Sequence, residues 1–404
     1  MMPVLDAWQR RLVVVAWITY ASFYLGRVNL STAIPSLQAD LDFSKSQVGL
    51  FATGHFAMYA LGSLINGRLG DRLSPRLFVT VGLLASAGLN LAFGLSSLWG
   101  VLFVVWTANG YVQSMGWGPV LRTLANWLGP VQRQRVSGVF GTSFVAGNAV
   151  TWLLTGWLVI AFGWRSAFLI PALLLVGFAF SWFLQVRDRP KEQAGNEVES
   201  LPTEPQPGGE GFLTGLSRSL RRYWLLALGS FFAGPLYIFF TIWTPTYFVE
   251  VGGLEIARAS SLAALLPLVG IGGIVLTGLL INRYLVGREV LALASVLGIL
   301  ALLFAVYPLL EFDLLRSALI FFLLSALVYG ITNLFLATMP LSLGRRGETS
   351  SVAGLLDFSF SIGGALSGVL IGAVLDTFSW TVAFSVLAAT ALIAALIVFR
   401  SQTA

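Results

Sequence analysis

The sequence predicts an all-α membrane protein with twelve transmembrane helices in two six-helix halves. Of its 404 residues, 57% are hydrophobic and only 10% are charged, and the mean hydropathy is +0.84. Soluble proteins carry roughly 25% charged residues. Twelve segments are apolar over the ~20 residues that a helix needs to cross the hydrocarbon core. One long polar stretch separates the first six segments from the last six.

The predicted spans are taken in chain order. The first contains Arg27, is too long for a signal peptide and lacks a small-residue cleavage site, so we expect it to be retained. The N-terminal bundle (1–186) and the C-terminal bundle (223–404) each hold six spans. These are 12–34, 45–66, 77–97, 99–121, 136–160 and 166–186, then 223–247, 259–282, 289–308, 315–341, 350–374 and 380–399.

Residues 187–222 form the predicted linker between the two bundles. Pro, Gly, Glu and Gln dominate its middle, and such a composition buries too little apolar surface to fold. Its last part, 212–223, places arginines beside apolar residues and predicts a short basic helix on the membrane surface.

The arginines predict the orientation of the chain in the membrane. With the N-terminus inside, most of the arginines fall in cytoplasmic segments, and the opposite face holds only Lys45, Arg165, Arg258 and Arg316. Lysine and arginine gather in cytoplasmic loops. We therefore expect a multi-pass protein of the inner (cytoplasmic) cell membrane, with both termini and the linker in the cytoplasm.

Composition also excludes several kinds of site. The chain has no cysteine and a single histidine, His55, which excludes thiolate metal sites and argues against a histidine-built one. Neither of its two lysines, Lys45 and Lys191, follows a glycine, so there is no phosphate-binding GK[ST] loop. We expect no enzymatic activity, no metal, no cofactor and a monomer. The net charge of +6 lies in inter-span loops and does not indicate nucleic-acid binding.

Two short stretches indicate an internal repeat. Gly67 begins "GRLGDRLSPR" after the second span, and Gly278 begins "GLLINRYLVGR" after the eighth, 211 residues later. Two related halves in the same order are typical of transporters built from parallel repeats. The second copy has Asn282 where the first has Asp71.

The first copy resembles the signature loop that major facilitator transporters carry between their second and third spans. The matching positions are Gly67, Asp71, Arg72 and Arg76. The resemblance implies the major facilitator fold, and in that family this loop latches the outward-facing state. A glycine permits close approach of two helices, and a carboxylate is attracted to basic groups and to helix N-termini.

Three further stretches resemble particular branches of that superfamily. "GYVQSMGWGPVLRTLANW" (110–127) and "IWTPTYFVEV" (242–251) are similar to the fourth and seventh spans of the organophosphate:phosphate antiporters, which include glycerol-3-phosphate and hexose-phosphate transporters. "RVNLSTAIP" (27–35) resembles the anion:cation symporters, which carry hexuronates and related carboxylates. Both families place an arginine of the first span at the substrate, and the matching residue is Arg27.

The antiporters carry additional cations that this chain lacks. On the same resemblance, Tyr237 stands where they have a second arginine, Phe144 where they have a histidine and Ser63 where they have a lysine. A second substrate charge left unpaired in a low-dielectric cavity costs several kcal/mol. We therefore expect a monoanionic acid to be preferred over a doubly ionised phosphate ester.

Ionisable residues are rare inside the predicted spans. Only Arg27, His55 and Asp357 lie well inside them, where a charge costs ~2.5 kcal/mol or more. A guanidinium binds carboxylate or phosphate through two parallel hydrogen bonds, so Arg27 is predicted to bind the substrate. Asp357, with His55 and Arg122, is predicted to serve coupling or a charge pair. For Asp357, proton exchange, a salt bridge with Arg27 or Arg122, contact with a cationic part of the substrate and a structural role stay open.

Polar side chains of the spans complete the predicted substrate site. Such groups need hydrogen-bond partners in hydrocarbon, and each is equally explained as a contact between helices. With Arg27, the residues predicted to line the substrate are Tyr24, Asn29, Gln113, Trp117, Tyr237, Trp243 and Asn333.

These observations predict a secondary active transporter of a small organic anion, a carboxylate or related compound, that works by alternating access. The expected coupling ion is a proton or a counter-anion. Two alternatives stay open. One is an organophosphate/phosphate antiporter or a sugar-phosphate membrane sensor, because the antiporter family contains both. The other is an exporter of drugs or lipids, for which Arg27 is dispensable.

Overall fold

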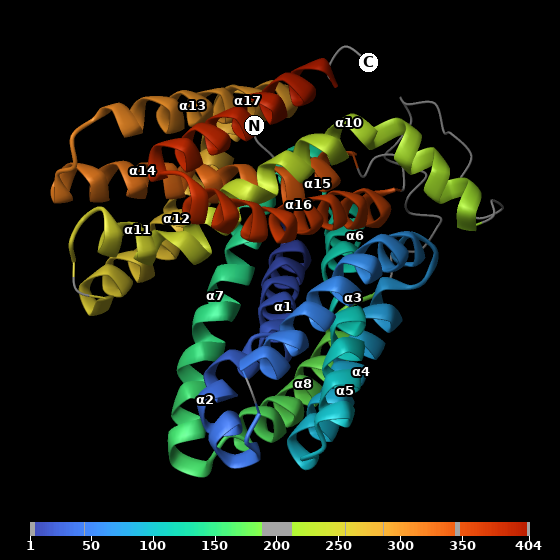
Figure 1. Ribbon diagram of the computed structural model, residues 1–404. Coiled ribbons are helices and arrows are strands. Elements are labelled where there is room, and N and C mark those ends of the chain that lie inside the picture. The colour runs from blue at the N-terminus through green and yellow to red at the C-terminus, as the bar shows by residue number, and fades with distance from the viewer. Residues whose placement is uncertain are drawn as a thin grey trace. The chain divides into compact units, whose positions relative to one another are not determined.

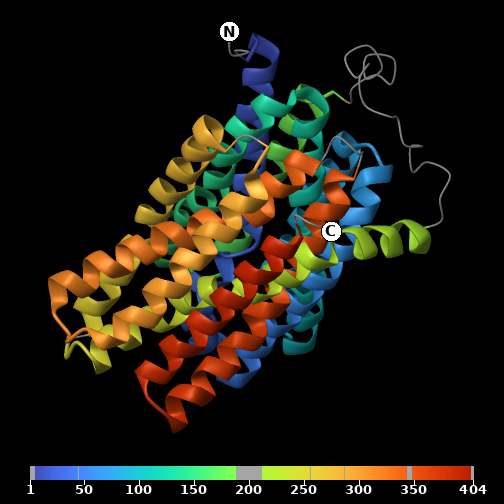
Figure 2. The same cartoon turned by 90° about the horizontal axis from the view of Figure 1, so that it is seen from above.

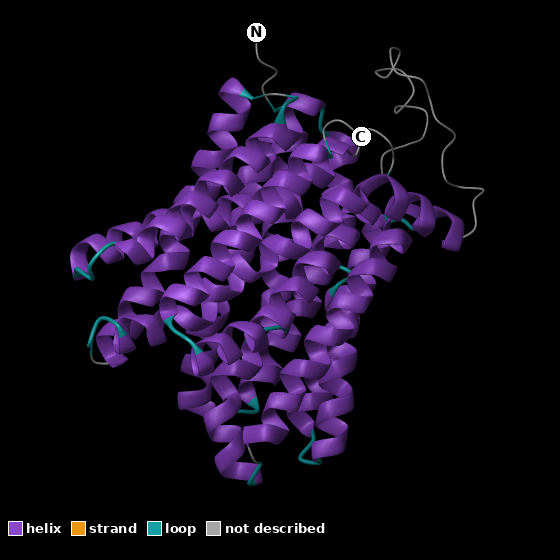
Figure 3. Ribbon diagram, turned by 45° about the horizontal axis from the view of Figure 1, so that its top comes forward, coloured by secondary structure: helices purple, strands orange, loops and turns teal. Residues whose placement is uncertain are grey.

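The computed structural model describes residues 5–43, 45–187, 212–254, 256–285, 287–343 and 348–401. Residues 188–211, which make up most of the predicted linker, lie outside these ranges. All regular structure within them is helical (Figure 3). Every one of the twelve predicted spans is helical along most of its length.

The first six predicted spans are built from eight α-helices and one 3₁₀ turn in the described residues. They are α1 (Ala7–Phe23), η1 (Tyr24–Gly26), α2 (Asn29–Leu41), α3 (Lys45–Arg72), α4 (Pro75–Leu95), α5 (Trp99–Gln113), α6 (Trp117–Trp127), α7 (Pro130–Phe162) and α8 (Ser166–Gln185).

The last six spans follow the same plan. They contain α10 (Phe212–Ile238), η3 (Phe239–Trp243), α11 (Thr244–Glu250), α12 (Ile256–Tyr284), α13 (Glu289–Val306), η4 (Tyr307–Leu309), α14 (Leu314–Asn333), η5 (Leu334–Thr338), α15 (Met339–Leu343), α16 (Thr349–Thr377) and α17 (Trp380–Arg400). The helix expected near 212–223 is the first part of α10, which continues into the seventh span.

Eight stretches of the described chain are long and apolar enough to cross a membrane by length and composition. Local signals set where several helices begin. Ser74 caps α4 by accepting a hydrogen bond from the Leu77 N–H, and Pro75 takes the first helical position, where no N–H is needed. At the start of α1, Asp6 and Gln9 form a reciprocal capping box.

Four of the spans are interrupted near their middle. The first has the 3₁₀ turn η1, and the fourth has a turn at 114–116 between α5 and α6. The seventh and tenth contain the π-helical segments η3 and η5. Such irregular segments release backbone polar groups and are frequent at functional sites. The interrupted helices are therefore where a site is to be sought.

The described chain clusters into two compact units. Unit 1 comprises Met1–Arg133, Ser143–Ser219 and Pro340–Leu355, and unit 2 comprises Gln134–Thr142, Leu220–Met339 and Leu356–Ala404. Residues 134–142 of α7 thus belong to unit 2, and the start of α16 belongs to unit 1. The boundaries expected at 186 and 223 remain predictions.

In unit 1, α4 packs along α5 and α8, and α3 packs along α5 (Figure 1). Part of its core is aromatic: the rings of Phe93 and Phe168 stack with centroids 4.3 Å apart, and Trp106 lies 5.2 Å from Phe93. These buried rings hold α4, α5 and α8 together.

In unit 2, α12 packs along α14 and α13 packs along α17 (Figure 2). Phe321 lies at the centre of an aromatic cluster, stacked on Tyr247 at 5.0 Å and close to Tyr307 and Phe384. The hydroxyls of Tyr247 and Tyr307 share a hydrogen bond of 2.6 Å. The two hydroxyls of the cluster thus satisfy one another.

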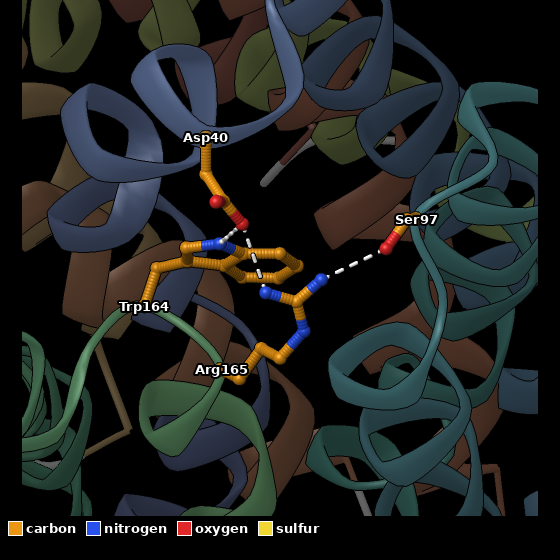
Figure 4. A network of polar contacts seen from close by, with 4 residues as sticks. All are labelled: Asp40, Ser97, Trp164 and Arg165. Atoms are coloured by element: carbon orange, nitrogen blue, oxygen red, sulfur yellow. Dashed lines mark hydrogen bonds and ion pairs between the residues drawn. The ribbon is translucent and has the colours of Figure 1, made fainter.

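A polar network closes the end of unit 1 that is predicted to face away from the cytoplasm (Figure 4). The Trp164 indole and the Arg165 guanidinium both donate to Asp40 Oδ2 at 2.9 Å, and Arg165 also donates to Ser97 at 2.8 Å. The hydrogen bond from Trp164, and then that from Arg165, hold the pKa of Asp40 below its usual value. The network joins the end of α2 to α8 and to the α4–α5 loop.

Candidate functional site

Arg27 lies in unit 1 just after η1, where the first span is interrupted. Its Nε donates to Gln113 Oε1 at 3.3 Å and its Nη2 donates to the Gln113 carbonyl at 3.4 Å. The guanidinium also lies over the rings of Tyr24, 4.9 Å from the centroid, and Tyr59, at 4.4 Å. Aromatic faces stabilise a cation without neutralising it. The guanidinium is thus oriented by an amide and flanked by two aromatic rings.

Gln113 is held by hydrogen bonds that extend away from Arg27. Its Nε2 donates to Ser86 Oγ at 2.8 Å, and Ser86 in turn donates to Asn109 Oδ1 at 2.8 Å. Asn109 Nδ2 donates to the carbonyl of Gly26 at 2.7 Å, in the turn that precedes Arg27. These hydrogen bonds lead from Arg27 back to Gly26, the residue before it. They therefore hold in place both η1 and the Gln113 amide that orients the guanidinium.

Asn29 extends this network on its far side. It is fully buried, and its Nδ2 donates to Asn90 Oδ1 at 2.9 Å and to the Ala167 carbonyl at 2.8 Å. Asn90 donates to the Gly26 carbonyl at 3.3 Å. Asn29 therefore joins the start of α2 to α4 and α8, and its contact with substrate remains a prediction.

Trp117 begins α6 and is 5% exposed. Its ring lies 4.4 Å from that of Tyr20, which lies 6.0 Å from Tyr24. Tyr24, Tyr20 and Trp117 therefore form an aromatic patch that begins at the Arg27 guanidinium. Two of the residues predicted to line the substrate, Tyr24 and Gln113, thus contact Arg27 directly, and Trp117 is connected to it through the rings of Tyr24 and Tyr20.

The predicted site residues of unit 2 lie at its interrupted helices. Tyr237 packs against Tyr329 at 5.4 Å and Phe360 at 5.9 Å. Trp243 ends η3. Its ring packs closely against Gly372, because a Cβ on that glycine would lie 3.3 Å from the ring. Tyr237, where the antiporters have a second arginine, therefore stands among aromatic side chains.

Asp357 and Asn333 also belong to unit 2. Asp357 is 7% exposed on α16, next to Leu356, whose carbonyl accepts a hydrogen bond of 2.9 Å from Ser230. Asn333 ends α14 and is 2% exposed, and neither its Oδ1 nor its Nδ2 has a hydrogen-bond partner in the described part of the chain. An amide buried without partners costs roughly 1–3 kcal/mol.

His55 and Arg122 occupy other positions in unit 1. His55 is 2% exposed, its Nδ1 lies 3.3 Å from the Trp106 carbonyl, and its ring stacks on Trp106 at 5.2 Å. It thus joins α3 to α5. Arg122 donates to the carbonyls of Gly70 and Leu73, the latter at 2.8 Å, at the end of α3. The coupling roles expected for both residues remain predictions.

A first seam, made by Gly67, Asp71, Ser350 and Gly354, joins α3 to the start of α16 within unit 1. A Cβ on Gly354 would lie 2.8 Å from the Cα of Gly67 and 2.0 Å from the carbonyl oxygen of Ser63. The two helices therefore touch backbone to backbone. The Asp71 carboxylate accepts hydrogen bonds from the N–H groups of Ser350, at 2.8 Å, and of the adjacent Ser351, at 2.7 Å.

Asp71 places a negative charge at the positive end of α16, a favourable arrangement. It lies beyond the predicted span 45–66 and is 6% exposed. Burial raises its pKa to about 6, against the opposing effect of the hydrogen bonds from Ser351 and Ser350 and of the Arg122 charge. Of the predicted latch residues, Gly67 and Asp71 thus meet at one contact.

The other predicted latch residues lie elsewhere. Arg72 is exposed at the end of α3. Arg76 donates to the Phe183 carbonyl at 2.6 Å and lies 4.1 Å from the centroid of that ring, so it holds α4 to α8. Their part in a latch remains a prediction.

A second seam, within unit 2, joins the start of α7 to α12, α13 and η5. Gly138 lies against Gly278, and a Cβ on Gly278 would lie 3.3 Å from the Gly138 Cα. Beside this contact, Gln134 donates to the Glu289 carboxylate. Thr338 donates to Ser137 at 3.1 Å.

In the same seam, Gly141 of α7 packs against Asn333, whose side-chain amide has no hydrogen-bond partner among the described residues. A Cβ on Gly141 would lie 1.8 Å from Asn333 Oδ1, so only glycine permits this approach. Asn333 therefore faces the backbone of α7, and it is exposed only if α7 moves away.

Comparison with known proteins places the chain in a family. The model of the Major Facilitator Superfamily matches residues 16–368. The chain belongs to this superfamily. A crystal structure of a transporter of the same superfamily, FucP, in the outward conformation, covers 96% of this chain and 98% of its own with a TM-score of 0.73 at 14% identity. The predicted all-α fold of twelve helices in two six-helix halves is confirmed, and this superfamily member is a multi-pass membrane protein.

Several curated relatives match nearly the whole chain, 96% of it in each case. A probable hexose phosphate transport protein of Chlamydia pneumoniae is 26% identical, with 90% of its length covered. The glycerol-3-phosphate transporter of Bacillus subtilis (strain 168) is 29% identical, with 90% covered. The membrane sensor protein UhpC of Salmonella typhimurium is 26% identical, with 90% covered. The resemblance to the organophosphate:phosphate antiporters is confirmed.

Several residues near Arg27 and on α3 were not predicted from the sequence. Tyr59 lies in an apolar span, where an aromatic residue is usually part of a core. Ser86 and Asn90 stand four residues apart on α4, a spacing that places both on one helix face and is the signal that sequence reasoning missed. Arg68 is 1% exposed, and its side-chain nitrogens have no hydrogen-bond partner among the described residues.

Proposed function

We propose that this superfamily member is a secondary transporter that carries a small phosphorylated organic anion across the inner cell membrane by alternating access. The observation that carries the proposal is Arg27, a guanidinium oriented by Gln113 and flanked by two tyrosine rings. A phosphate group presents the bidentate acceptor that such a guanidinium binds well. The names of the two transporters similar to this chain support a phosphate over the carboxylate first expected.

The single cation limits the charge that the site can neutralise. Tyr237 packs among aromatic rings at the position where the antiporters have a second arginine. A phosphate ester loses its second proton near pH ~6, so a singly charged form is available at mildly acidic pH. We propose that this monoanion is the form transported, which retains the expectation that a doubly ionised ester is disfavoured.

Counterflow in proteoliposomes tests the proposal. Purified protein is reconstituted with internal inorganic phosphate, and uptake of labelled hexose phosphate and glycerol phosphate is measured against sugar acids as competitors. Phosphate esters should compete best, and their apparent affinity should rise as the pH falls from 7.5 to 6. Arg27→Gln should lower uptake more than a hundredfold, because it removes a pair of charge-assisted hydrogen bonds worth roughly 1.5–3 kcal/mol each. Arg316→Gln, far along the chain in α14, is the matched control.

Three results would contradict the proposal. Preferred competition by sugar acids would return the carboxylate as substrate. Full uptake by Arg27→Gln would remove the anion site and favour an exporter of apolar compounds. Binding of phosphate esters without any flux would favour a membrane sensor, a role named for the relative UhpC.

A further inference from the structure

A groove lies on unit 1 where the beginning of α1 meets the end of α8. It has a volume of about 360 Å³, which is within the range of small-ligand sites. Its lining residues are Arg10, Arg11, Val14, Val15, Ile18, Thr19, Ser181 and Gln185. Arg27 and the residues of the two seams are not among the lining residues, so the groove differs from the sites described above.

The groove is polar at one end and apolar along its length. Arg10 and Arg11 stand at its mouth, and Val14 and Ile18 follow along α1 at the spacing that places residues on one helix face. Val14 is 56% exposed and Ile18 is 40% exposed. From Arg10 to Ile18 the helix rises ~12 Å. A ligand that fits this groove is amphiphilic, with its head at the arginines.

The mouth of the groove carries a positive charge that its lining does not compensate. Arg11 donates to the neutral amide of Gln185 at 3.3 and 3.2 Å. Among the residues that the structure describes, no acidic side chain lines the groove. The carboxylate of Asp6, one turn earlier, accepts from the Gln9 N–H. That carboxylate therefore serves as the cap of α1 and faces its positive end, while the two arginines stand in the following turn.

We propose that this groove is a binding site for an anionic phospholipid of the inner leaflet. The phosphate lies between Arg10 and Arg11, Gln185 and Ser181 face the glycerol region, and one acyl chain follows Val14 and Ile18. Basic pockets between helices on the cytoplasmic side are suited to anionic headgroups. Because α1 leads directly to Tyr24 and Arg27, the lipid holds the base of the helix that carries the fixed charge.

Lipid-specific fluorescence quenching in the full chain tests this site. The chain lacks cysteine, so Leu184→Cys, at a position 72% exposed next to Gln185, can carry one fluorophore, and Leu392→Cys, at 50% exposed on α17, serves as the distant control. The variants are placed in phosphatidylcholine nanodiscs containing a small fraction of lipid with brominated chains, either phosphatidylglycerol or phosphatidylcholine. Brominated phosphatidylglycerol should quench the Leu184→Cys label several-fold more effectively, and the Leu392→Cys label no more than phosphatidylcholine does.

Substitutions distinguish the contribution of the lipid headgroup from that of the acyl chain. Arg10→Gln and Arg11→Gln should each lower the preference for phosphatidylglycerol roughly fivefold, whereas Arg400→Gln should not. Val14→Trp should fill the groove and abolish the preference with both charges in place. Equal quenching by the two lipids, or an unchanged preference in the double arginine variant, would overturn the proposal. Displacement by free inorganic phosphate alone would also overturn it, because that result assigns the site to a soluble anion.

Discussion

Gly67 and Gly278, the pair that the internal repeat aligns, each lie at a close contact between two glycines, and the polar groups beside them differ. In the first seam, the carboxylate of Asp71 accepts two backbone N–H groups at 2.8 and 2.7 Å. In the second, the position that matches Asp71 is Asn282, and the acid is Glu289, which accepts from the side chain of Gln134. The repeat thus keeps the glycine and changes the chemistry around it.

Because the polar groups beside the two glycine contacts differ, we expect the two seams to differ in stability. In the first, one carboxylate accepts two backbone N–H groups at the start of α16, which satisfies donors that the helix itself leaves free. The second holds an amide–carboxylate pair and also buries Asn333 without partners in the described chain. We therefore expect the first seam to be the tighter one and the second to open more readily. Four predictions test this comparison.

The largest effect is expected from adding one methyl group at the glycine contacts. On Gly354 a Cβ would lie 2.0 Å from the Ser63 carbonyl oxygen, which is backbone and cannot move aside; on Gly138 it would lie 3.5 Å from the nearest atom, ordinary contact. Gly354→Ala should lower uptake tenfold or more, in line with ~1–3 kcal/mol for overpacking. Gly138→Ala should stay within about twofold. Equal losses in the two variants would remove the difference between the seams.

The second effect concerns the acids, and it is measured as opening of each seam. Single cysteines at Ser351, 4% exposed, and at Ser137, 1% exposed, report on the first and second seams through their rates of labelling by a maleimide. Asp71→Asn should raise labelling at Ser351→Cys about tenfold, because the amide keeps one acceptor oxygen and presents its NH2 group to the second backbone N–H. Glu289→Gln should raise labelling at Ser137→Cys less, about threefold.

The opposite order of these two effects would mean that Glu289, not Asp71, holds the tighter contact. Either reporter labelled at the same rate in parent and variant would remove that acid from its seam. The matched control is Glu311→Gln, which removes a carboxylate at an exposed position outside both seams.

The sequence alone predicted the helices, and it predicted some of the residues around Arg27 and in the first seam. Hydropathy predicted all twelve spans, because each apolar run has about the ~20 residues that a helix needs to cross the hydrocarbon core. It did not predict the breaks at η1, η3 and η5, since the residues there are as apolar as their surroundings. Asp71 was predicted from its motif, yet its partner Ser350 stands 279 residues later, and no local pattern joins two such positions.

Glu289 was missed for a different reason. The repeat directed attention to Asn282, and the acid that contacts α7 stands seven residues further on. Likewise, Arg27 was predicted from the cost of burying its charge, whereas Tyr59 and Ser86 carry no such cost and become visible only when the helices are packed.

The third effect, about fivefold, comes from Asn333 and Gly141. Gly141→Ala should raise labelling at Ser137→Cys, because its Cβ would lie 1.8 Å from Asn333 Oδ1. That obstacle is the end of a side chain, so Asn333→Ala in the same chain should restore the parent rate to within twofold. Asn333→Ala alone should slow labelling, since it removes an amide that is unsatisfied while the seam is closed. Simple addition of the two single effects would show that these residues do not interact.

The smallest effect, about threefold, is a pH dependence confined to the first seam. The pKa of Asp71 is raised by burial to about 6 when the seam is closed, and an exposed aspartate titrates near ~3.9. The closed form therefore binds the proton more tightly, so linkage favours closure as the pH falls from 7 to about 5.6. Labelling at Ser351→Cys should slow about threefold relative to Ser137→Cys, whose rate corrects for the reagent's own pH dependence. The ratio should become constant in Asp71→Asn, which has no carboxyl group to titrate; a ratio that still falls there would assign the pH dependence to another group of the seam.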